Sequence, residues 1–313
     1  MVWGPVNTSQ LFSMRRLCSP YSTLLLVLFF ASSVMAAIPW PKDYVVAEDS
    51  KSGNGRYGVL IPARDSSSAD LDQPANYFAN LEKHKILGQI RNSFYSEGRN
   101  HQALGVYWAP DFSWVVVEYD GRFGFDSLTI AEVGDDAINQ TDVGREIQQS
   151  INAVIAKAEH TSKEIADVSV YCRPTSERRL KVRALATTDP KQLDPAHGFY
   201  ALFQGTYDLA SKKWKVTDTR LLTADANDAL SSAYGPVTSS DMSFPDDAAK
   251  AKYLDEQLNA VYKGLRFILP PARFAEIKQE QIAWLKQRDA AGSDAQKLKL
   301  IDARITALQD LLW

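Results

Sequence analysis

Carboxylates gather in one short stretch of the chain, where they could act together as acid and base. Glu118, Asp120 and Asp126 flank a glycine-containing turn around Arg122. Two carboxyl groups with different pKa values can hydrolyse a polar bond, one as acid and one as base. Solvated carboxylates are also typical of turns. The stretch therefore supports a hydrolase as one hypothesis, and we assign no catalytic residue from it.

The other reactive side chains do not combine into a known site. The four histidines are scattered, and no two have the close spacing of a metal site: His84, His101, His160 and His197. Cys172 lies in an apolar, strand-like pattern, which is typical of a buried and unreactive thiol. The chain has no Gly-x-Ser-x-Gly elbow, no glycine-rich phosphate loop and no His-Glu-x-x-His. We therefore expect a binding protein rather than an enzyme, with no metal and no cofactor.

Four residues near the C-terminus are candidate binding residues. Trp284 and Tyr262 are aromatic residues at helical spacing, which is most often a core position. Arg288 and Asp289 are adjacent. They can form a binding pair on the surface or an ion pair at a helix end, where the helix dipole favours the arginine. We keep Trp284, Arg288, Asp289 and Tyr262 as candidates.

Three amphipathic helices are predicted to position these residues. Their apolar residues recur at spacings of three and four over 244–269, 271–289 and 293–312. Ser243, followed three residues later by Asp246 with Pro245 between them, is a plausible N-terminal signal for the first helix. Pro270 and Pro271 end that helix, and Ser293 with Gln296 has the pattern of a capping box. No single helix of this length buries its apolar face alone. We predict a three-helix domain over residues 244–313.

This segment resembles the small helical domain of the LprI-type lysozyme-inhibitor family, which is found in bacterial envelope proteins. The resemblance covers roughly residues 250 to 312 and is carried by Leu258-Asn259, Tyr262, Leu265, Leu269-Pro270, Gln281, Trp284-Leu285, Arg288-Asp289, Arg304 and Leu308. Family members commonly have a cysteine just after the Arg-Asp pair, where this chain has Ala290-Ala291-Gly292. No disulfide can therefore form within the module. The resemblance implies binding to lysozyme or to another envelope protein.

The first 36 residues have the three parts of a secretory signal peptide. Arg15 and Arg16 precede an apolar run over residues 23–31, and small residues follow up to Ala36. The run is shorter than the roughly 20 residues that span a bilayer. We expect cleavage after Ala36 and no stable membrane span afterwards, with the protein in the periplasm or secreted. Whether translation starts at Met1 or Met14 stays open.

Residues 38–222 are predicted to form an antiparallel β-rich domain with one packed helix over 141–160. Short β-branched and aromatic runs alternate with Gly, Pro, Asn and Asp turns, and residues 199–221 are the clearest hairpin. The segment 108–117 weakly resembles a hairpin of TolB-like or WD-type propellers. Residues 223–243, rich in Ala, Asp and Ser, are interpreted as a linker.

Charge excludes some partners and leaves others open. The formal net charge is −3, and Arg15 and Arg16 would be lost with the signal peptide. Acidic and basic residues balance in the helical segment, so the negative charge lies in the β-rich part. Neither part is basic enough to favour nucleic acid. We predict an α+β envelope binding protein, with a lysozyme-inhibitor-like factor as the leading hypothesis. The alternatives are a non-inhibitory propeller-like scaffold and a hydrolase using Asp120 and Asp126. The oligomeric state is left open.

Overall fold

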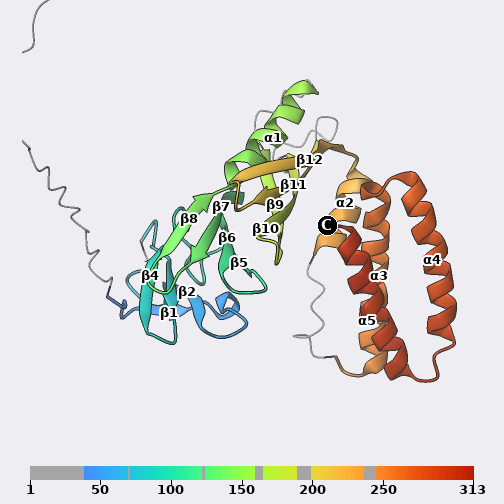
Figure 1. The fold of residues 1–313 in the computed structure, drawn as a ribbon, viewed down its shortest axis with the longest axis horizontal. Coiled ribbons are helices and arrows are strands. Elements are labelled where there is room, and N and C mark those ends of the chain that lie inside the picture. Colours follow the sequence, from blue (N-terminus) through green and yellow to red (C-terminus); the bar gives the residue numbers. More distant parts are fainter. Residues whose placement is uncertain (1–38, 70, 122–123, 159–164, 189–198, 236–243) are drawn as a thin grey trace, which may run out of the picture. The chain divides into compact units, whose positions relative to one another are not determined.

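The computed structural model describes residues 39–69, 71–121, 124–158, 165–188, 199–235 and 244–313. Residues 38–313 form one compact unit. In the described ranges the chain forms three antiparallel sheets of four strands each, with one helix between the second and third sheets and helices after the third (Figure 1). This confirms the predicted α+β class. None of the helices in these ranges has the length and apolar run that crossing a bilayer requires. The predicted signal peptide lies outside the described residues.

The first sheet is a meander whose strands follow one another in space as in sequence. It consists of β1 (Tyr44–Val46), β2 (Tyr57–Pro62), β3 (Tyr77–Asn80) and β4 (Lys85–Gln89). All six residues of β2 are buried. A run of apolar residues without polar alternation is typical of a strand covered on both faces. The short outer strands β1 and β4 were not among the predicted strands.

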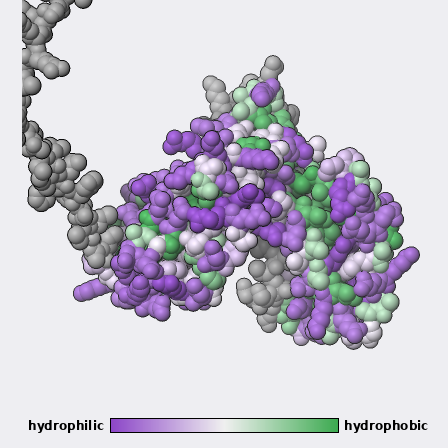
Figure 2. Space-filling view, in the orientation of Figure 1, coloured by the Kyte–Doolittle hydropathy of each residue, from purple (hydrophilic) through white to green (hydrophobic). Residues whose placement is uncertain are grey.

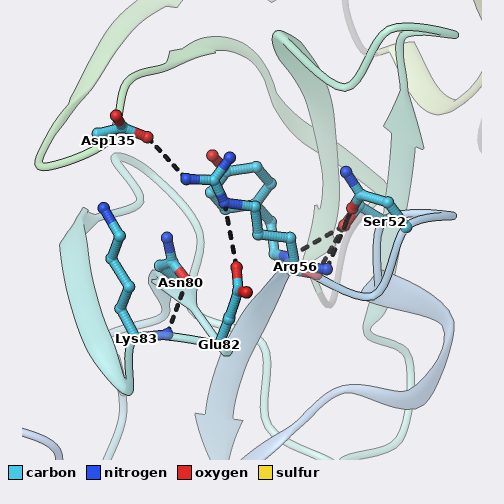
Figure 3. Close-up of polar contacts among 8 residues, drawn as sticks. Ser52, Arg56, Asn80, Glu82, Lys83 and Asp135 are labelled. Atoms are coloured by element: carbon cyan, nitrogen blue, oxygen red, sulfur yellow. Dashed lines mark hydrogen bonds and ion pairs between the residues drawn. The ribbon is translucent and has the colours of Figure 1, made fainter.

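Polar contacts hold the entry to β2 (Figure 3). The Ser52 hydroxyl accepts a hydrogen bond from the Tyr57 backbone N–H at 2.9 Å. The Arg56 guanidinium donates to Asp135 at 2.8 Å and lies 3.6 Å from Glu82. Because Asp135 follows the third strand of the next sheet, this ion pair connects the first two sheets. Exposed pairs of this kind contribute at most about 1 kcal/mol.

The second sheet lies between the first and the third. Its strands are β5 (Ala103–Trp108), β6 (Trp114–Gly121), β7 (Gly124–Val133) and β8 (Ile138–Asp142). Side chains alternate between the faces of β6. Val115 and Val117 pack in one core with the first sheet. Trp114 and Val116 pack in a second core with α1 (Gly144–Lys157) and the third sheet.

The third sheet has four strands of nine or ten residues and packs against the C-terminal helices. It consists of β9 (Ile165–Pro174), β10 (Arg179–Thr188), β11 (Tyr200–Asp208) and β12 (Lys213–Leu222). β11 and β12 pair antiparallel, as predicted for the hairpin over 199–221. The helix predicted over 141–160 is present as α1, with Ile147, Ile151 and Ile155 buried against the sheets.

The sequence suggested a resemblance to propeller hairpins, and the structure has three successive four-stranded meanders in which neighbouring sheets share hydrophobic cores. Three sheets are fewer than the four to eight blades of a propeller. The outer face of the third sheet is occupied by helices, since Leu185 of β10 and Leu202 of β11 belong to the helical core. The propeller resemblance therefore remains a prediction.

Helices α3 (Asp247–Ile268), α4 (Pro271–Asp289) and α5 (Asp294–Leu311) match the three predicted helices. Asp246 caps α3 by accepting from the Ala249 N–H at 2.7 Å. Ser293 accepts from the Gln296 N–H at 3.3 Å. The Gln296 side chain accepts in return from the Gly292 N–H at 3.1 Å. The predicted capping box is thus present, with its return bond shifted by one residue.

The interpretation of residues 223–243 as a linker has to be corrected for its first half. Residues Ala224–Tyr234 form α2, whose N-cap Thr223 accepts from the Ala226 N–H. Buried residues at helical spacing place α2 against α3. Its closest approach is at Gly264, where an added Cβ would lie 2.5 Å from the Ala233 Cβ. The composition hid this helix because its buried residues are mostly small.

Candidate protein-binding groove on the helical module

A groove runs between α3 and α4, and we call it the α3–α4 groove. Its volume is about 380 Å³. It is lined by Asp255, Leu258, Asn259, Tyr262, Lys278, Gln281, Ile282, Leu285 and Arg288. Six of these residues belong to the pattern that carries the LprI resemblance in the sequence. The resembling positions therefore meet at one concave surface, although they come from two helices.

A second, wider hollow adjoins this groove between α2 and α3. Its volume is about 1060 Å³, and it shares Asn259, Tyr262 and Lys278 with the α3–α4 groove. Its charged lining is mixed, with both carboxylates and cations. On the face that Figure 2 shows, the helical part likewise mixes hydrophobic and hydrophilic residues. Surfaces of mixed polarity are usual for non-obligate protein interfaces.

Tyr262 occupies the shared wall of the two hollows. It is half-buried on α3, and its ring lies 5.3 Å from the ring of Phe274 on α4. A half-buried tyrosine offers both an apolar ring and a polar hydroxyl to a partner. Tyr262 is therefore placed both to pack the helices and to contact a ligand in the groove.

Trp284 lies beneath the groove rather than in it. Only 9% of its surface is exposed, and it packs in the core that α3, α4 and α5 share. Burying an indole removes a large apolar area from water. This burial agrees with the core position that its spacing predicted. A direct contact between Trp284 and a partner remains a prediction that its burial does not favour.

Arg288 links α4 to α3. Its guanidinium donates to Asp255 of α3 at 3.0 Å and to the neighbouring Asp289 at 2.9 Å. It also lies 5.5 Å from the centre of the Trp284 ring, a cation–π arrangement. The side chain of Asp289 is 66% exposed. The helix-end ion pair is thus present, and Arg288 also forms one end of the groove.

Residues outside the predicted set complete the groove. Asn259, Lys278 and Ile282 line it, and Ile282 is 42% exposed. Ile282 lies off the apolar stripe of its helix, which was a signal that the sequence analysis did not use. Gln281, which also lines the groove, accepts a hydrogen bond from Arg304 of α5 at 2.9 Å. Long side chains thus hold α4 to both neighbouring helices.

The carboxylates considered for hydrolysis are not all solvated, as carboxylates at a turn usually are. Glu118 is 6% exposed, and it accepts hydrogen bonds from the Tyr107 hydroxyl at 2.9 Å and from the Val170 backbone N–H. Burial, followed by the negative charge of Asp120, raises the pKa of Glu118 to about 8. Burial and nearby carboxylates raise the pKa of Asp120 to about 6, and burial raises that of Asp126.

These carboxylates do not form an open catalytic cleft. None of the three lines the hollows described for this chain, and Glu118 lies between the second and third sheets. Arg122, at the turn, lies outside the described residues. Cys172 is partly buried next to Glu118, and burial raises the pKa of its thiol. A thiol with a raised pKa is a poor nucleophile.

The described residues hold no group of three or more His, Cys, Asp or Glu side chains that could bind a metal ion. His84 stacks on Trp40 with ring centres 3.9 Å apart, while His101 is exposed. His160 and His197 lie outside the described residues. The histidines within the described ranges thus show no common site.

Comparison with known proteins identifies the helical module. The comparisons with curated proteins and with solved structures found no match. One family model does match, and it is the family that the sequence pattern of this segment resembles. Residues 247–307, which span α3, α4 and most of α5, match the family model described as "Lysozyme inhibitor LprI".

Proposed function

We propose that this chain is an exported envelope protein that binds a protein partner through the α3–α4 groove and inhibits lysozyme. One observation carries the proposal. Six residues of the LprI pattern converge from two helices on one groove. In this groove Tyr262 and Ile282 offer apolar contact, and Lys278 and Asn259 offer polar contact. A concave surface with a few polar groups is the usual form of a binding site.

Export is proposed from the sequence of residues 1–36 and from the family match. A lysozyme inhibitor meets its target outside the cytoplasm, which agrees with a secretory signal peptide. We therefore place the mature protein in the periplasm or outside the cell. Fractionation of cells that express the full chain tests this step, and the expected product in the exported fraction begins near Ala37.

Inhibition is tested with the full mature chain, residues 37–313, because the helices share a core with the third sheet. A suspension of peptidoglycan is digested by an animal-type lysozyme, and the loss of turbidity is followed with and without the protein. We expect slower clearing with the wild-type chain. Unchanged clearing across protein concentrations, together with no binding by calorimetry, would overturn the proposal.

The groove itself is tested by a matched pair of substitutions on α4. Ile282→Ser removes an exposed apolar contact in the groove, and Ala283→Ser changes the next exposed residue, which does not line it. We expect Ile282→Ser to weaken binding and inhibition together and Ala283→Ser to leave both unchanged. Equal effects of the two substitutions would exclude this groove as the contact surface. Binding without inhibition would instead favour the non-inhibitory scaffold.

The hydrolase hypothesis has weaker support. Only the raised pKa values of Glu118 and Asp120 favour it, since strongly perturbed carboxyl groups cluster at catalytic sites. If the Asp126 carboxyl group takes part in hydrolysis, any hydrolysis found in the purified chain should disappear in the Asp126→Asn variant. Unchanged hydrolysis in that variant would exclude the Asp126 role.

A further inference from the structure

Another hollow lies in the β-rich part, between an edge strand of the first sheet and an edge strand of the second. It is far along the chain from the helical module. It has a volume of about 340 Å³, and we call it the β1–β5 hollow. β1 is an outer strand of the first sheet and β5 an outer strand of the second. Its lining includes the apolar side chains of Val45, Val46, Ile61, Leu104 and Val106. Val45 is 41% exposed.

All charged residues that line this hollow are acidic. They are Glu48 and Asp49, which follow β1, and Glu97, which precedes β5. Each is exposed, and within the described ranges none of the three side chains forms an ion pair or a hydrogen bond. The wide hollow on the helices differs, because its lining carries cations as well as carboxylates.

Among the described residues, no basic side chain forms an ion pair with these three carboxylates. Arg99 follows Glu97 by two positions, but its guanidinium donates to the backbone carbonyls of Ala69 and Asp72. Arg56 is engaged by two other carboxylates, as Figure 3 shows. The carboxylates also do not form a group that could hold a metal ion, as judged over the described residues. Their charge is therefore available to an organic cation.

We propose that the β1–β5 hollow binds a lysine or arginine side chain of a basic protein partner. The methylene stem of such a side chain can lie against Val45, Leu104 and Val106, while its charged end meets the carboxylates at the rim. The identity of the partner rests on the proposed function, because lysozymes are commonly basic. The cationic chemistry rests on the hollow alone. Acidic surfaces of this kind mainly increase the association rate with a basic partner.

The charge distribution along the chain agrees with this division of roles. Residues 241–313 have eleven acidic and eleven basic residues, so the helical segment offers no net attraction to a basic protein. The excess negative charge of the chain lies in the β-rich part. In this proposal the α3–α4 groove supplies specific contacts and the β1–β5 hollow supplies electrostatic attraction.

The first experiment tests the cationic chemistry without lysozyme. Methyl groups of Val and Leu are labelled in the mature chain, and the capped peptide acetyl-Gly-Arg-Gly-amide is added at millimolar concentration while NMR spectra are recorded. We expect shifts at Val45, Leu104 and Val106 that are absent with the corresponding glutamine peptide. The triple variant Glu48→Gln, Asp49→Asn, Glu97→Gln should lose these shifts. Absence of shifts in the wild-type chain, or their persistence in the triple variant, would overturn the proposal.

The second experiment measures binding of an animal-type lysozyme by surface-based kinetics at low and moderate salt. The control is Asp65→Asn, Asp72→Asn, Asp302→Asn, which removes the same charge from exposed positions outside the hollow. We expect the hollow variant to associate about tenfold more slowly and with less salt dependence, and the control to change much less. Equal effects of the two triple variants would exclude the hollow as a contact. Peptide binding without any lysozyme binding would contradict the proposed function and leave the hollow's cationic site supported.

Discussion

Glu118 makes the stability of this protein depend on pH over a range in which most carboxyl groups are already ionised. Its pKa is about 8 in the folded chain against an ordinary value of 4.5. Since the folded pKa is raised, the stabilisation is fully present below pH 4.5 and is lost as pH rises through 8. The difference corresponds to at most about 5 kcal/mol of unfolding free energy, because one pKa unit is about 1.36 kcal/mol.

The substitution Glu118→Gln isolates this contribution. A neutral glutamine keeps an oxygen that can accept from the Tyr107 hydroxyl and the Val170 N–H, but it cannot ionise. Urea unfolding of the mature chain is measured from pH 4 to pH 9. Below pH 4.5 we expect the variant to be within about 1 kcal/mol of the wild type. Above pH 8 it should be more stable, by up to about 5 kcal/mol.

The difference between the two unfolding curves is the quantity to inspect, because Asp120, whose pKa is raised to about 6, also titrates in this range. Glu48→Gln is the control, since Glu48 is exposed and has no side-chain partner in the described residues. Its curve should run parallel to that of the wild type. Parallel curves for Glu118→Gln as well would refute the reasoning, because they would mean that burial does not penalise the Glu118 charge.

The helical module allows three further predictions by urea unfolding at neutral pH. Gly264→Ala should destabilise by about 1–3 kcal/mol, because its methyl would meet the Ala233 Cβ at 2.5 Å. Gly292→Ala, whose methyl would make only an ordinary contact of 3.6 Å with the Gln296 side chain, should be nearly neutral, and equal effects would contradict this. Trp284→Ala should cost about 3–5 kcal/mol, and a smaller loss than 1 kcal/mol would show that the indole is not core. Arg183→Met should lower the unfolding free energy by about 1–3 kcal/mol, because the backbone carbonyls of Leu312 and Trp313 lose their donor. Amide hydrogen exchange at the end of α5 should become faster, and unchanged exchange would contradict this prediction.

The sequence predicted well what depends on local periodicity. The alternating and apolar runs of β2, β6 and β11 and the stripes of α3, α4 and α5 were found because each long element must bury one side. The outer strands β1, β4 and β8 were not predicted. They have three to five residues each, and short edge strands carry too few positions for a pattern to emerge.

Features that depend on contacts between distant parts of the chain could not be predicted from local sequence patterns. The sequence placed Glu118 in an exposed acidic turn, but the third sheet covers it, and Val170 on β9 supplies one of its donors. The groove shows the same limit in part. Tyr262 and Arg288 were identified from the family pattern, whereas Lys278 and Ile282 join them only because α3 and α4 pack together.

The packing of the helices determines which of their faces a partner can reach. The matched family segment ends at residue 307, yet Leu308 and Leu312 are buried beyond it, and Arg183 of β10 donates to the backbone carbonyls of Leu312 and Trp313. α2 covers α3 at Gly264. The sides that face α2 and the third sheet are thus occupied by the chain itself. The α3–α4 groove, where six of the family residues lie, is left uncovered by these contacts and is open to the partner proposed above.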